Sequence, residues 1–292
     1  MKVLITGAAG FIARHLIEDL GSPFNIIACS RKELELTDTA AVESTLKHGK
    51  FDAVIHAATY DAAPLNSPKD PAKVLENNLL MFFNLARCQN YFEKMIYFGS
   101  GAEFSRLFWK PKMSEDYFNQ HVPVDQYGLS KYTMTQYALT TNNIFNLRLF
   151  GLFGKYDDWR YRVIPAACAK AALGLPLTVE QNKAFDFLYI DQLIEVVRWM
   201  LLNRPRFQVY NVCSGGSYTF AELIQKVNVI AGSKVPIHAK NDEPVLTYSG
   251  DNTRLLSELT QFTIPPIDDS IADLYTWYLT HKALINPNEF HY

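Results

Sequence analysis

Tyr127 and Lys131 are four residues apart in the segment Tyr127-Gly128-Leu129-Ser130-Lys131. On a helix this spacing puts both side chains on one face, with about 6 Å between their β-carbons. A phenol with a free pKa of about 10 is a poor acid-base catalyst at neutral pH. A nearby ammonium favours the phenolate, so we expect Lys131 to lower the pKa of Tyr127 toward the working range. The pair therefore predicts proton transfer to or from an oxygen of a substrate.

Ser100 supplies a third polar group. The apolar segment 94–98 predicts a strand, which runs into Gly99-Ser100-Gly101. In an open α/β sheet, the carboxyl ends of the central strands border the ligand crevice. A hydroxyl at that edge is placed to polarise a carbonyl group of a substrate. Ser100, Tyr127 and Lys131 are therefore the candidate catalytic residues.

A glycine turn near the N-terminus predicts a dinucleotide site. Gly7 ends the strand-like segment 2–6, and the helical segment 11–20 begins directly after Gly10. Gly7 permits a tight turn, Gly10 lets the backbone approach a pyrophosphate, and the helix N-terminus offers N–H donors to the phosphates. The candidate cofactor contacts of this turn are Gly7, Ala9, Gly10, Phe11 and Ile12. The alternative is an ordinary strand-to-helix turn.

The end of the second strand favours NADP(H). In an NAD-preferring site this strand ends in an acidic residue that binds the ribose hydroxyls. Here the segment 25–29 runs into Ser30, Arg31 and Lys32. A hydroxyl and two cations suit a 2′-phosphate, because Arg donates charge-assisted, bidentate hydrogen bonds to it. NAD(H) is the alternative, since Arg31 and Lys32 are also typical of a solvated loop.

Short apolar segments alternate with amphipathic ones through the first half of the chain, which is typical of βα units that form a parallel sheet. The predicted strands are 3–6, 25–29, 53–56, 94–98 and 144–149. The predicted helices are 11–20, 39–48, 71–90 and 126–140. Loops 59–69 and 99–125 follow strands and are too long for simple connections, so we expect them to border a ligand site.

The regular alternation ends after Gly154. We expect further helices at 162–173, 193–202 and 220–231, and strands at 177–179 and 208–212. The predicted fold class is α/β: a Rossmann doubly wound parallel sheet with a smaller C-terminal substrate-binding lobe. Residues 1–154 and 187–214 are assigned to the dinucleotide-binding domain, and residues 155–186 and 215–292 to the lobe.

Composition excludes several classes of protein. The 292 residues are 48% hydrophobic and 20% charged, with a formal net charge of -2, as in an ordinary globular protein. Without a basic excess, nucleic acid is not an expected partner. No apolar segment reaches the roughly 20 residues that span a bilayer, so no membrane is expected either. Cys29, Cys88, Cys168 and Cys213 are scattered among apolar neighbours, which predicts buried thiols, no metal site and a cytoplasmic protein.

Together these segments resemble the extended short-chain dehydrogenase/reductases, the group of nucleotide-sugar epimerases, dehydratases and 4-keto reductases. The resemblance covers nearly the whole chain. Its motifs are Thr6 to Ile12, His56-Ala57-Ala58, Asn78 with Asn84, Gly99-Ser100, Tyr127 to Lys131, Leu147 to Gly154 and Phe185 to Asp191. The segment Ser30 to Asp38 is similar to the corresponding segment of GDP-fucose synthases, which use NADPH. That similarity supports the NADP(H) prediction.

The resemblance implies catalytic roles for Ser100, Tyr127 and Lys131, the last two also lying against the cofactor. The further cofactor contacts that it implies are His56, Ala57, Ala58 and Asn78. It also implies a nucleotide-diphosphate sugar as substrate, held by the later half of the chain. A homodimer built from the helices around 72–90 and 126–140 is implied as well.

The positions after Ser100 favour a simple reduction. Dehydratases of this family carry an Asp-Glu pair where this chain has Gly101 and Ala102, and we expect Glu103 to point to the other side of the strand end. GDP-fucose synthases use an additional Cys and His, which would fall at Ala102 and near Tyr156. A 4-keto-sugar reductase is therefore the expected enzyme. The alternatives are a nucleotide-sugar C4 epimerase and a catalytically silent dinucleotide-binding protein.

Recognition of the sugar nucleotide departs from the family pattern. Members commonly carry an Arg before the equivalent of Asp186 to bind the diphosphate, whereas this chain has Phe185. A diphosphate still needs cations. The candidate substrate contacts are Arg162, Lys183 and Arg254, each of which is equally compatible with a surface charge. The resemblance also implies a role in surface polysaccharide synthesis.

Overall fold

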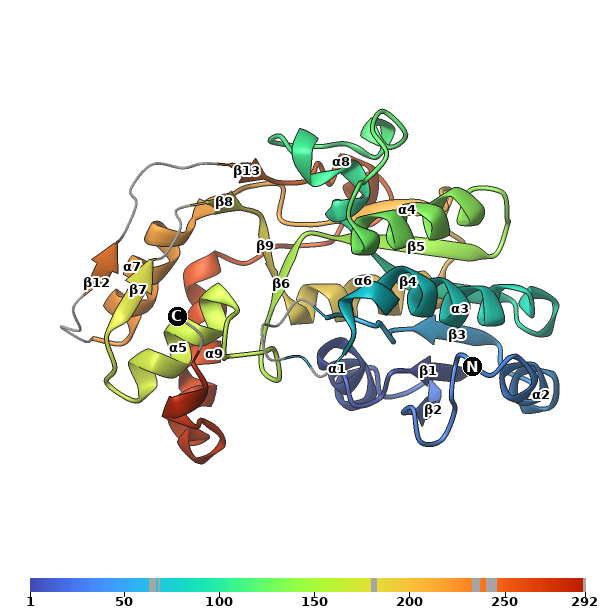
Figure 1. The fold of residues 1–292 in the computed structure, drawn as a ribbon, viewed down its shortest axis with the longest axis horizontal. Coiled ribbons are helices and arrows are strands. Elements are labelled where there is room, and N and C mark those ends of the chain that lie inside the picture. The colour runs from blue at the N-terminus through green and yellow to red at the C-terminus, as the bar shows by residue number, and fades with distance from the viewer. Residues whose placement is uncertain (63–66, 68, 180–182, 233–236, 240–245, 291–292) are drawn as a thin grey trace.

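A six-stranded parallel sheet forms the centre of the molecule (Figure 1). The computed structural model describes residues 1–62, 67, 69–179, 183–232, 237–239 and 246–290. The sheet has the order β10-β5-β4-β3-β1-β2. Its strands are β1 (Lys2–Thr6), β2 (Asn25–Cys29), β3 (Ala53–His56), β4 (Lys94–Ser100), β5 (Ile144–Leu149) and β10 (Val209–Val212). The predicted α/β fold class with a parallel sheet is confirmed.

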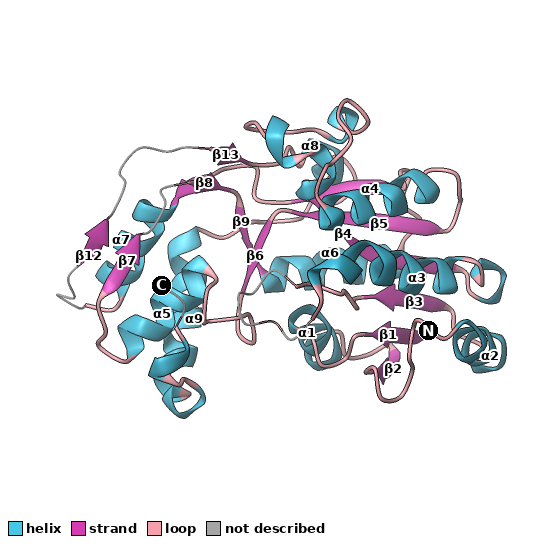
Figure 2. Ribbon diagram, in the orientation of Figure 1, coloured by secondary structure: helices cyan, strands magenta, loops and turns pink. Residues whose placement is uncertain are grey.

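Helices cover both faces of this sheet (Figure 2). On one face lie α1 (Phe11–Asp19) and α6 (Ile190–Leu202), which share a core cluster with Val3 and Ile5 of β1. On the other face lie α2 (Thr39–Gly49), α3 (Val74–Ala86) and α4 (Gln126–Ala138), which share a cluster with Leu4. Neighbouring residues of a strand point to opposite faces, so a strand buried on both sides must be apolar throughout. The short, continuous apolar segments of the sequence meet this requirement.

The strand order reverses between β1 and β3. From β1 the chain first adds β2 on one side and then β3, β4, β5 and β10 on the other. At such a switch point the loops that leave the two strands diverge, and the sheet opens a crevice at its carboxyl edge. The turn at Gly7 follows β1, and the segment 56–58 follows β3. The predicted dinucleotide residues therefore lie at the switch point.

The second lobe lies beside the carboxyl edge of the sheet, on the left in Figure 1. Its core consists of α5 (Val163–Ala172), α7 (Phe220–Ile230) and α9 (Ile267–Thr280) with β7 (Leu177–Val179), which pairs with β12 (Ile237–Ala239). Short strands join the two parts: β6 (Gly151–Phe153), β8 (Ala184–Phe185), β9 (Phe187–Tyr189), β11 (Tyr218–Thr219) and β13 (Thr247–Tyr248). Leu255, in α8 (Thr253–Leu256), packs in the core of the sheet domain, although the sequence assigned residues 215–292 to the lobe.

The ends of the strands predicted for the first half of the chain agree with the structure to within two residues. The ends of the predicted helices 11–20, 39–48 and 126–140 agree equally well. The predicted helix 71–90 is interrupted, because short 3-10 turns at Pro71–Lys73 and Gln89–Tyr91 flank α3. The structure adds α8, α9 and six strands of two or three residues that were not predicted. Strands this short are not long enough to show an alternation of apolar and polar residues. They form because segments distant in sequence supply their hydrogen-bond partners.

A buried ion pair fixes the carboxyl end of β4. The carboxylate of Glu103 accepts a hydrogen bond from Arg148 Nε at 2.9 Å, and both side chains are 0% exposed. The other carboxylate oxygen accepts from the backbone N–H of Ser100 at 2.9 Å. Thr135 of α4 and Asn146 of β5 also donate to Glu103. Glu103 therefore points away from the crevice, as expected, and joins β4, β5 and α4 beneath Ser100.

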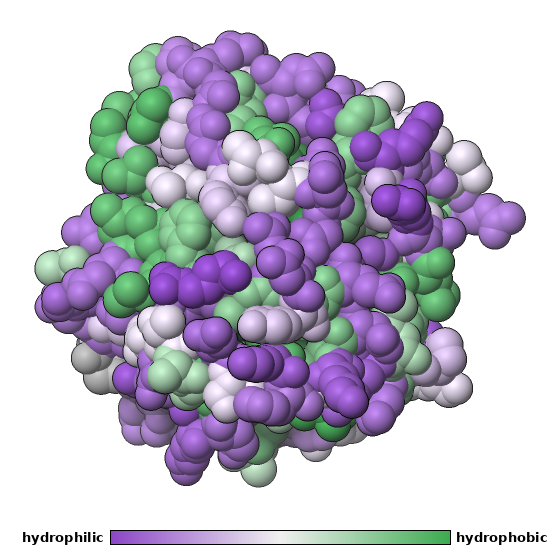
Figure 3. All heavy atoms as spheres, turned by 90° about the vertical axis from the view of Figure 1, so that its right-hand side faces the viewer, coloured by the Kyte–Doolittle hydropathy of each residue, from purple (hydrophilic) through white to green (hydrophobic). Residues whose placement is uncertain are grey.

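One face of the surface and the four thiols are typical of a globular protein. The side of the molecule away from the second lobe is mostly hydrophilic (Figure 3). No helix in the described part of the chain is both long and apolar enough to cross a membrane. The four cysteines are free thiols; Cys88, Cys168 and Cys213 are buried as predicted, whereas Cys29 is half-buried. Within the described residues, no three His, Cys, Asp or Glu side chains are grouped as a metal site.

Candidate active site

A cavity of about 500 Å³ lies between the carboxyl edge of the sheet and the second lobe. Its walls come from both parts of the molecule. From the sheet domain come Phe11, Ile12, His56, Ala57, Ala58, Ser100, Tyr127 and Lys131, and from the lobe come Arg162, Phe185, Phe187, Phe220 and Tyr248. The structure thus brings predicted catalytic, cofactor and substrate residues to one cavity.

The three candidate catalytic side chains converge in this cavity. Ser100 ends β4, and its side chain lines the cavity together with the phenol of Tyr127 from α4. Asp125 caps α4 by accepting from the backbone N–H of Gly128 at 2.8 Å, which fixes the first helical turn and so Tyr127. Lys131 lies one turn further along, with its ammonium 5.8 Å from the centre of the Tyr127 ring. The spacing on one helix face is therefore as predicted.

The expected effect of Lys131 on Tyr127 is wrong for this structure. Burial, followed by the negative charge of Asp61, raises the pKa of Tyr127 to about 12, and hydrogen bonding by Ser100 only partly offsets this. The ammonium of Lys131 instead donates to the backbone oxygen of Phe98 at 2.8 Å. Burial lowers the pKa of Lys131 to about 8. Tyr127 consequently holds its proton at neutral pH and is poised as a general acid.

The segment after β3 forms one wall of the cavity. His56 is buried, and its Nδ1 lies 3.0 Å from the hydroxyl of Thr6. Burial, together with the charge of Lys131, lowers the pKa of His56 to about 3, so the imidazole is neutral. Asn78 accepts from the backbone N–H of Tyr60 at 2.8 Å and donates to its oxygen at 3.1 Å. Asn78 thus braces the loop that follows the cavity wall, from a position behind it.

The glycine turn between β1 and α1 has a backbone conformation that requires a residue without a side chain. Gly7 has φ +75, and a β-carbon there would lie 2.7 Å from the backbone nitrogen of Ala58. The residue must be glycine for both reasons. Gly10 begins α1, and among the described residues no side chain caps that helix end. Its first N–H groups, with the positive end of the helix dipole, are available to phosphate oxygens. Ala9 lies exposed in the same turn.

The loop after β2 holds the residues predicted to select the cofactor. The backbone N–H and the hydroxyl of Ser30 both donate to the carboxylate of Glu33. Arg31 is 82% exposed and pairs with Glu35 at 2.6 Å. Lys32 is exposed beside them. Ser30, Arg31 and Lys32 therefore lie after β2, where the cofactor-selecting residues were expected. Within the same loop, however, Ser30 is already bonded to Glu33 and Arg31 is paired with Glu35.

Of the three cations proposed for the substrate, the structure brings one to the cavity. Arg162 lines it, with its Nε 4.0 Å from Asp157. Arg254 instead binds Asp116 at 2.8 Å, and its Nε lies 3.6 Å from Glu115. Lys183 is half-buried near the start of β8 and is not part of the described cavity wall.

Several cavity residues were missed by sequence reasoning. Asp61, Arg106, Asp157 and Tyr248 line the cavity, and nothing in their local sequence marks them. Burial raises the pKa of Asp157 to about 6, and its Oδ2 has no hydrogen-bond partner among the described residues. Loop position gave the only available signal, because Asp61 and Arg106 belong to the two long loops that were expected to border a ligand.

The aromatic-rich segments 104–109 and 156–161 contribute some rings to the cavity wall, whereas other rings pack elsewhere. Trp109 and Tyr161 line the cavity, although the segments 104–109 and 156–161 gave no means of distinguishing stacking on a ligand from core packing. Tyr156 lies elsewhere, with its hydroxyl donating to Glu18 of α1 at 2.9 Å. A base at that position would not reach the cavity.

A dinucleotide cradle beside a Ser-Tyr-Lys trio defines an enzyme that binds a nicotinamide dinucleotide and transfers hydride. The chain belongs to the NAD dependent epimerase/dehydratase family, whose model matches residues 3–213. The predicted resemblance to extended short-chain dehydrogenase/reductases is thereby confirmed.

Individual relatives include both reductases and epimerases. GDP-L-colitose synthase of Yersinia pseudotuberculosis is 24% identical, over 97% of this chain and 99% of its own. The structure of UDP-glucose 4-epimerase from Thermotoga maritima, with UDP-glucose, superimposes with a TM-score of 0.82 at 18% identity, over 98% of this chain and 100% of its own. The structure of GDP-mannoheptose C4 reductase from Campylobacter jejuni, with NADP bound, superimposes with a TM-score of 0.81 at 22% sequence identity. The match covers 95% of this chain and 98% of the reductase. Identities this low show a shared fold and leave the reaction open.

The Gly7 turn gives a direct test of the cradle. Gly7→Ala should weaken NADPH binding about tenfold or more, because the new methyl group collides with the backbone of Ala58. Gly21→Ala is the matched control, since Gly21 also has a positive φ, +52, but has nothing within 4 Å of the added carbon. Titration of NADPH fluorescence measures both affinities. Equal affinities in the two variants would contradict the assignment of the cradle.

Proposed function

We propose that the protein reduces a nucleotide-linked 4-keto-(6-deoxy)sugar with NADPH. The observation that carries this proposal is the buried phenol of Tyr127, which keeps its proton at neutral pH and lines the cavity beside Ser100 and Lys131. A carbonyl reduction must add a proton to the substrate oxygen, and a phenol that retains its proton at neutral pH is able to supply it.

The chain provides each group that such a reduction needs. The bound cofactor supplies the hydride. The hydroxyls of Ser100 and Tyr127 donate hydrogen bonds to the carbonyl oxygen, so that negative charge developing there is stabilised. Tyr127 then gives its proton to that oxygen, which becomes the new hydroxyl group. Lys131 keeps a positive charge beside the phenol and offsets the charge left on it.

Dehydration is a poor fit to the same geometry. It requires an acid and a base next to the catalytic hydroxyl, and the chain has Gly101 and Ala102 there. Glu103, the next carboxylate, is turned away into its buried pair with Arg148. The cavity therefore retains the groups for hydride transfer, whereas the two positions directly after Ser100 carry no side chain that could remove a hydroxyl from C6.

A nucleotide sugar suits the mixed character of the cavity. Aromatic rings of Trp109, Phe185 and Phe220 provide apolar faces, and Arg162 provides a cation for a phosphate. The names of the colitose synthase and the mannoheptose reductase support a GDP-linked sugar. For the cofactor, we propose that a 2′-phosphate replaces Glu33 on the donors of Ser30 and recruits the exposed Arg31. NADPH is then preferred to NADH.

The C4 epimerase is the second candidate, because the structural likeness to a UDP-glucose 4-epimerase is as high as that to the reductases. An epimerase uses the same Ser-Tyr-Lys trio in two successive hydride transfers and retains its cofactor. The two activities are therefore separated by net consumption of NADPH.

The deciding experiment follows the near-ultraviolet absorbance of NADPH while GDP-, dTDP- and UDP-linked 4-keto-6-deoxysugars are added to the full-length enzyme. Stoichiometric loss with one of them is expected, and NADH should support a slower rate. Tyr127→Phe should lower kcat by about 100-fold or more, the usual effect of losing a general acid. Interconversion of UDP-glucose and UDP-galactose without NADPH loss would instead establish the epimerase.

The rate should also depend on pH through Lys131. Its pKa of about 8 means that the ammonium beside Tyr127 loses its charge as pH rises, whereas Tyr127 remains protonated up to about pH 12. The kcat/KM for reduction should therefore be constant below about pH 7 and fall about tenfold per pH unit above pH 8. The Lys131→Arg variant should react more slowly, but its side chain stays charged over this pH range. Its kcat/KM should therefore not fall above pH 8. A wild-type profile that stays flat to about pH 10 would refute the role of Lys131.

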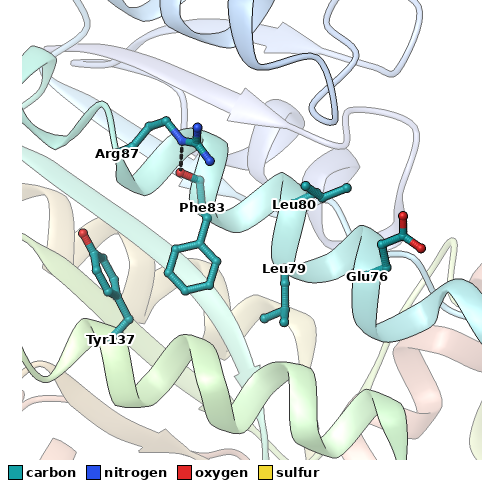
Figure 4. Close-up of a pocket in the computed structure, with 6 residues that line it drawn as sticks. All are labelled: Glu76, Leu79, Leu80, Phe83, Arg87 and Tyr137. Atoms are coloured by element: carbon teal, nitrogen blue, oxygen red, sulfur yellow. Dashed lines mark hydrogen bonds between the residues drawn. The ribbon is translucent and has the colours of Figure 1, made fainter.

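We further propose that α3 and α4 form the contact between two copies of the chain. Their outer faces enclose a shallow surface hollow lined by the largely apolar Leu79, Leu80, Phe83 and Tyr137 and by the charged Glu76 and Arg87 (Figure 4). Leu80 and, just beyond α4, Leu139 are 39% and 47% exposed. A two-fold axis would place the same apolar face against itself and bury these groups in a four-helix arrangement.

Light scattering tests this arrangement. The wild-type protein should have the mass of two chains, and Leu80→Glu should shift it toward one chain, because the interface would then bury paired like charges. Val229→Glu, at a 68% exposed position on α7, is the control and should leave the mass unchanged. A wild-type mass of one chain would rule the dimer out.

A further inference from the structure

Tyr156 has a backbone conformation that residues other than glycine rarely adopt. It lies in the segment between β6 and α5, with φ +70. This left-handed region is unfavourable for a residue with a β-carbon, so it persists only where surrounding contacts hold it. Residues of this kind often occur beside functional sites, where they set the direction of a neighbouring segment. We therefore expect the Tyr156 side chain to be held in place.

Helix α1 holds this side chain. The phenol of Tyr156 donates to Glu18 Oε1 at 2.9 Å. Its ring lies 5.4 Å from the imidazole of His15, centre to centre, and the guanidinium carbon of Arg14 lies 5.3 Å from the ring centre. Trp277 of α9 meets the same ring edge-on at 5.7 Å. The turn at Tyr156 is therefore fixed by contacts from both parts of the molecule.

The residues before Tyr156 are anchored on the same side of the sheet domain. The backbone oxygen of Lys155 accepts from His15 Nε2 at 2.9 Å, and the Lys155 ammonium donates to Glu18 Oε2 at 3.0 Å. A β-carbon at Gly154 would lie 2.5 Å from a side-chain carbon of Ile190 in α6, so the backbone passes close to that helix. Helix α1 begins at the glycine turn. One helix thus supports both this segment and the predicted cofactor site.

The turn leads directly into the wall of the cavity. Asp157 follows it and is 9% exposed, and Arg162 precedes α5; both line the cavity. The backbone N–H of Asp157 donates to the oxygen of Gly154 at 3.3 Å, and that of Arg162 donates to the oxygen of Asp158 at 3.1 Å. The conformation of residues 157–162 therefore follows from the turn, and with it the place of two charged groups beside the substrate space.

We propose that Tyr156, held by Glu18, is a positioning residue that sets the cavity wall of residues 157–162 and thereby strengthens substrate binding. The proposal rests on the proposed function for the identity of that substrate, a nucleotide-linked 4-keto sugar. The catalytic trio belongs to other elements, β4 and α4. Loss of the Tyr156 contacts should therefore weaken ground-state and transition-state binding alike and leave the chemical step nearly unchanged.

Steady-state kinetics test this, with NADPH and the 4-keto sugar that the wild-type enzyme reduces. Tyr156→Gly removes the side chain, but glycine adopts the left-handed conformation readily, so the turn itself stays allowed. The variant should raise KM for the sugar about tenfold and keep kcat within about threefold of wild type. An unchanged KM would overturn the proposal, because the turn would then be sufficient without the side chain.

Glu18 should act through the same phenol. Tyr156→Phe keeps the ring and removes only the hydrogen bond to Glu18, and it should raise KM about threefold, the effect of one ordinary hydrogen bond. In the Glu18→Ala background the same substitution should have no further effect on KM, since the acceptor is already absent. Independent, multiplicative changes would contradict the role of Glu18.

Lys50→Gly is the matched control. Lys50 also has a positive φ, +48, but it is exposed at the C-terminal end of α2. Both KM and kcat of this variant should equal those of the wild type. An equal rise in KM for Lys50→Gly and Tyr156→Gly would indicate general loosening by glycine and would overturn a specific role for Tyr156.

Hydrogen–deuterium exchange of the full chain needs no substrate, so it tests Tyr156 even if the proposed reduction fails. Tyr156→Gly should speed amide exchange in residues 157–162 about tenfold, because their hydrogen bonds depend on the turn, and should leave β4 and α4 unchanged. Lys50→Gly should leave all three regions unchanged. Wild-type exchange at 157–162 in the Tyr156→Gly variant would show that Tyr156 does not hold the wall, whatever reaction the enzyme performs.

Discussion

The active site depends on one buried ion pair, Glu103 with Arg148. Two fully buried charges are costly unless each is paired and the remaining hydrogen-bonding groups are satisfied. Here Glu103 also accepts from the backbone of Ser100 and from Thr135, so the pair joins β4, β5 and α4 at a single point. Arg148 Nη1 donates to Asn211, whereas Nη2 has no hydrogen-bond partner among the described residues. The position of Ser100 relative to Tyr127 follows from this junction, since one ends β4 and the other begins α4.

Burial decides the protonation of the site more than the neighbouring charges do. Tyr127 and Lys131 lie on one helix face, yet desolvation dominates both groups and drives each toward its neutral form. A neutral phenol supplies a proton, which agrees with a carbonyl reduction.

The lobe gives the cavity its distinct character. Phe185 precedes Asp186 in the sequence, and its ring contacts those of Trp109, Phe220 and Tyr248. Arg162 is the cation that the lobe contributes among the described cavity residues, and it lies near Asp157. The described cavity wall therefore combines these aromatic rings with the charged side chains of Asp61, Arg106, Lys131, Asp157 and Arg162.

The sequence by itself determined the dinucleotide fold and the trio. Gly7 and Gly10 stand at a strand-helix junction where only small residues fit, and the i, i+4 spacing of Tyr127 and Lys131 is a local property of one helix. Only the tertiary structure decided the high pKa of Tyr127, the place of Arg254 outside the cavity, and the approach of Tyr248 to Gly101. These features depend on burial and on contacts between residues more than a hundred positions apart. Such contacts form when β-strands of two or three residues pair with distant segments, and no local sequence pattern predicts this pairing.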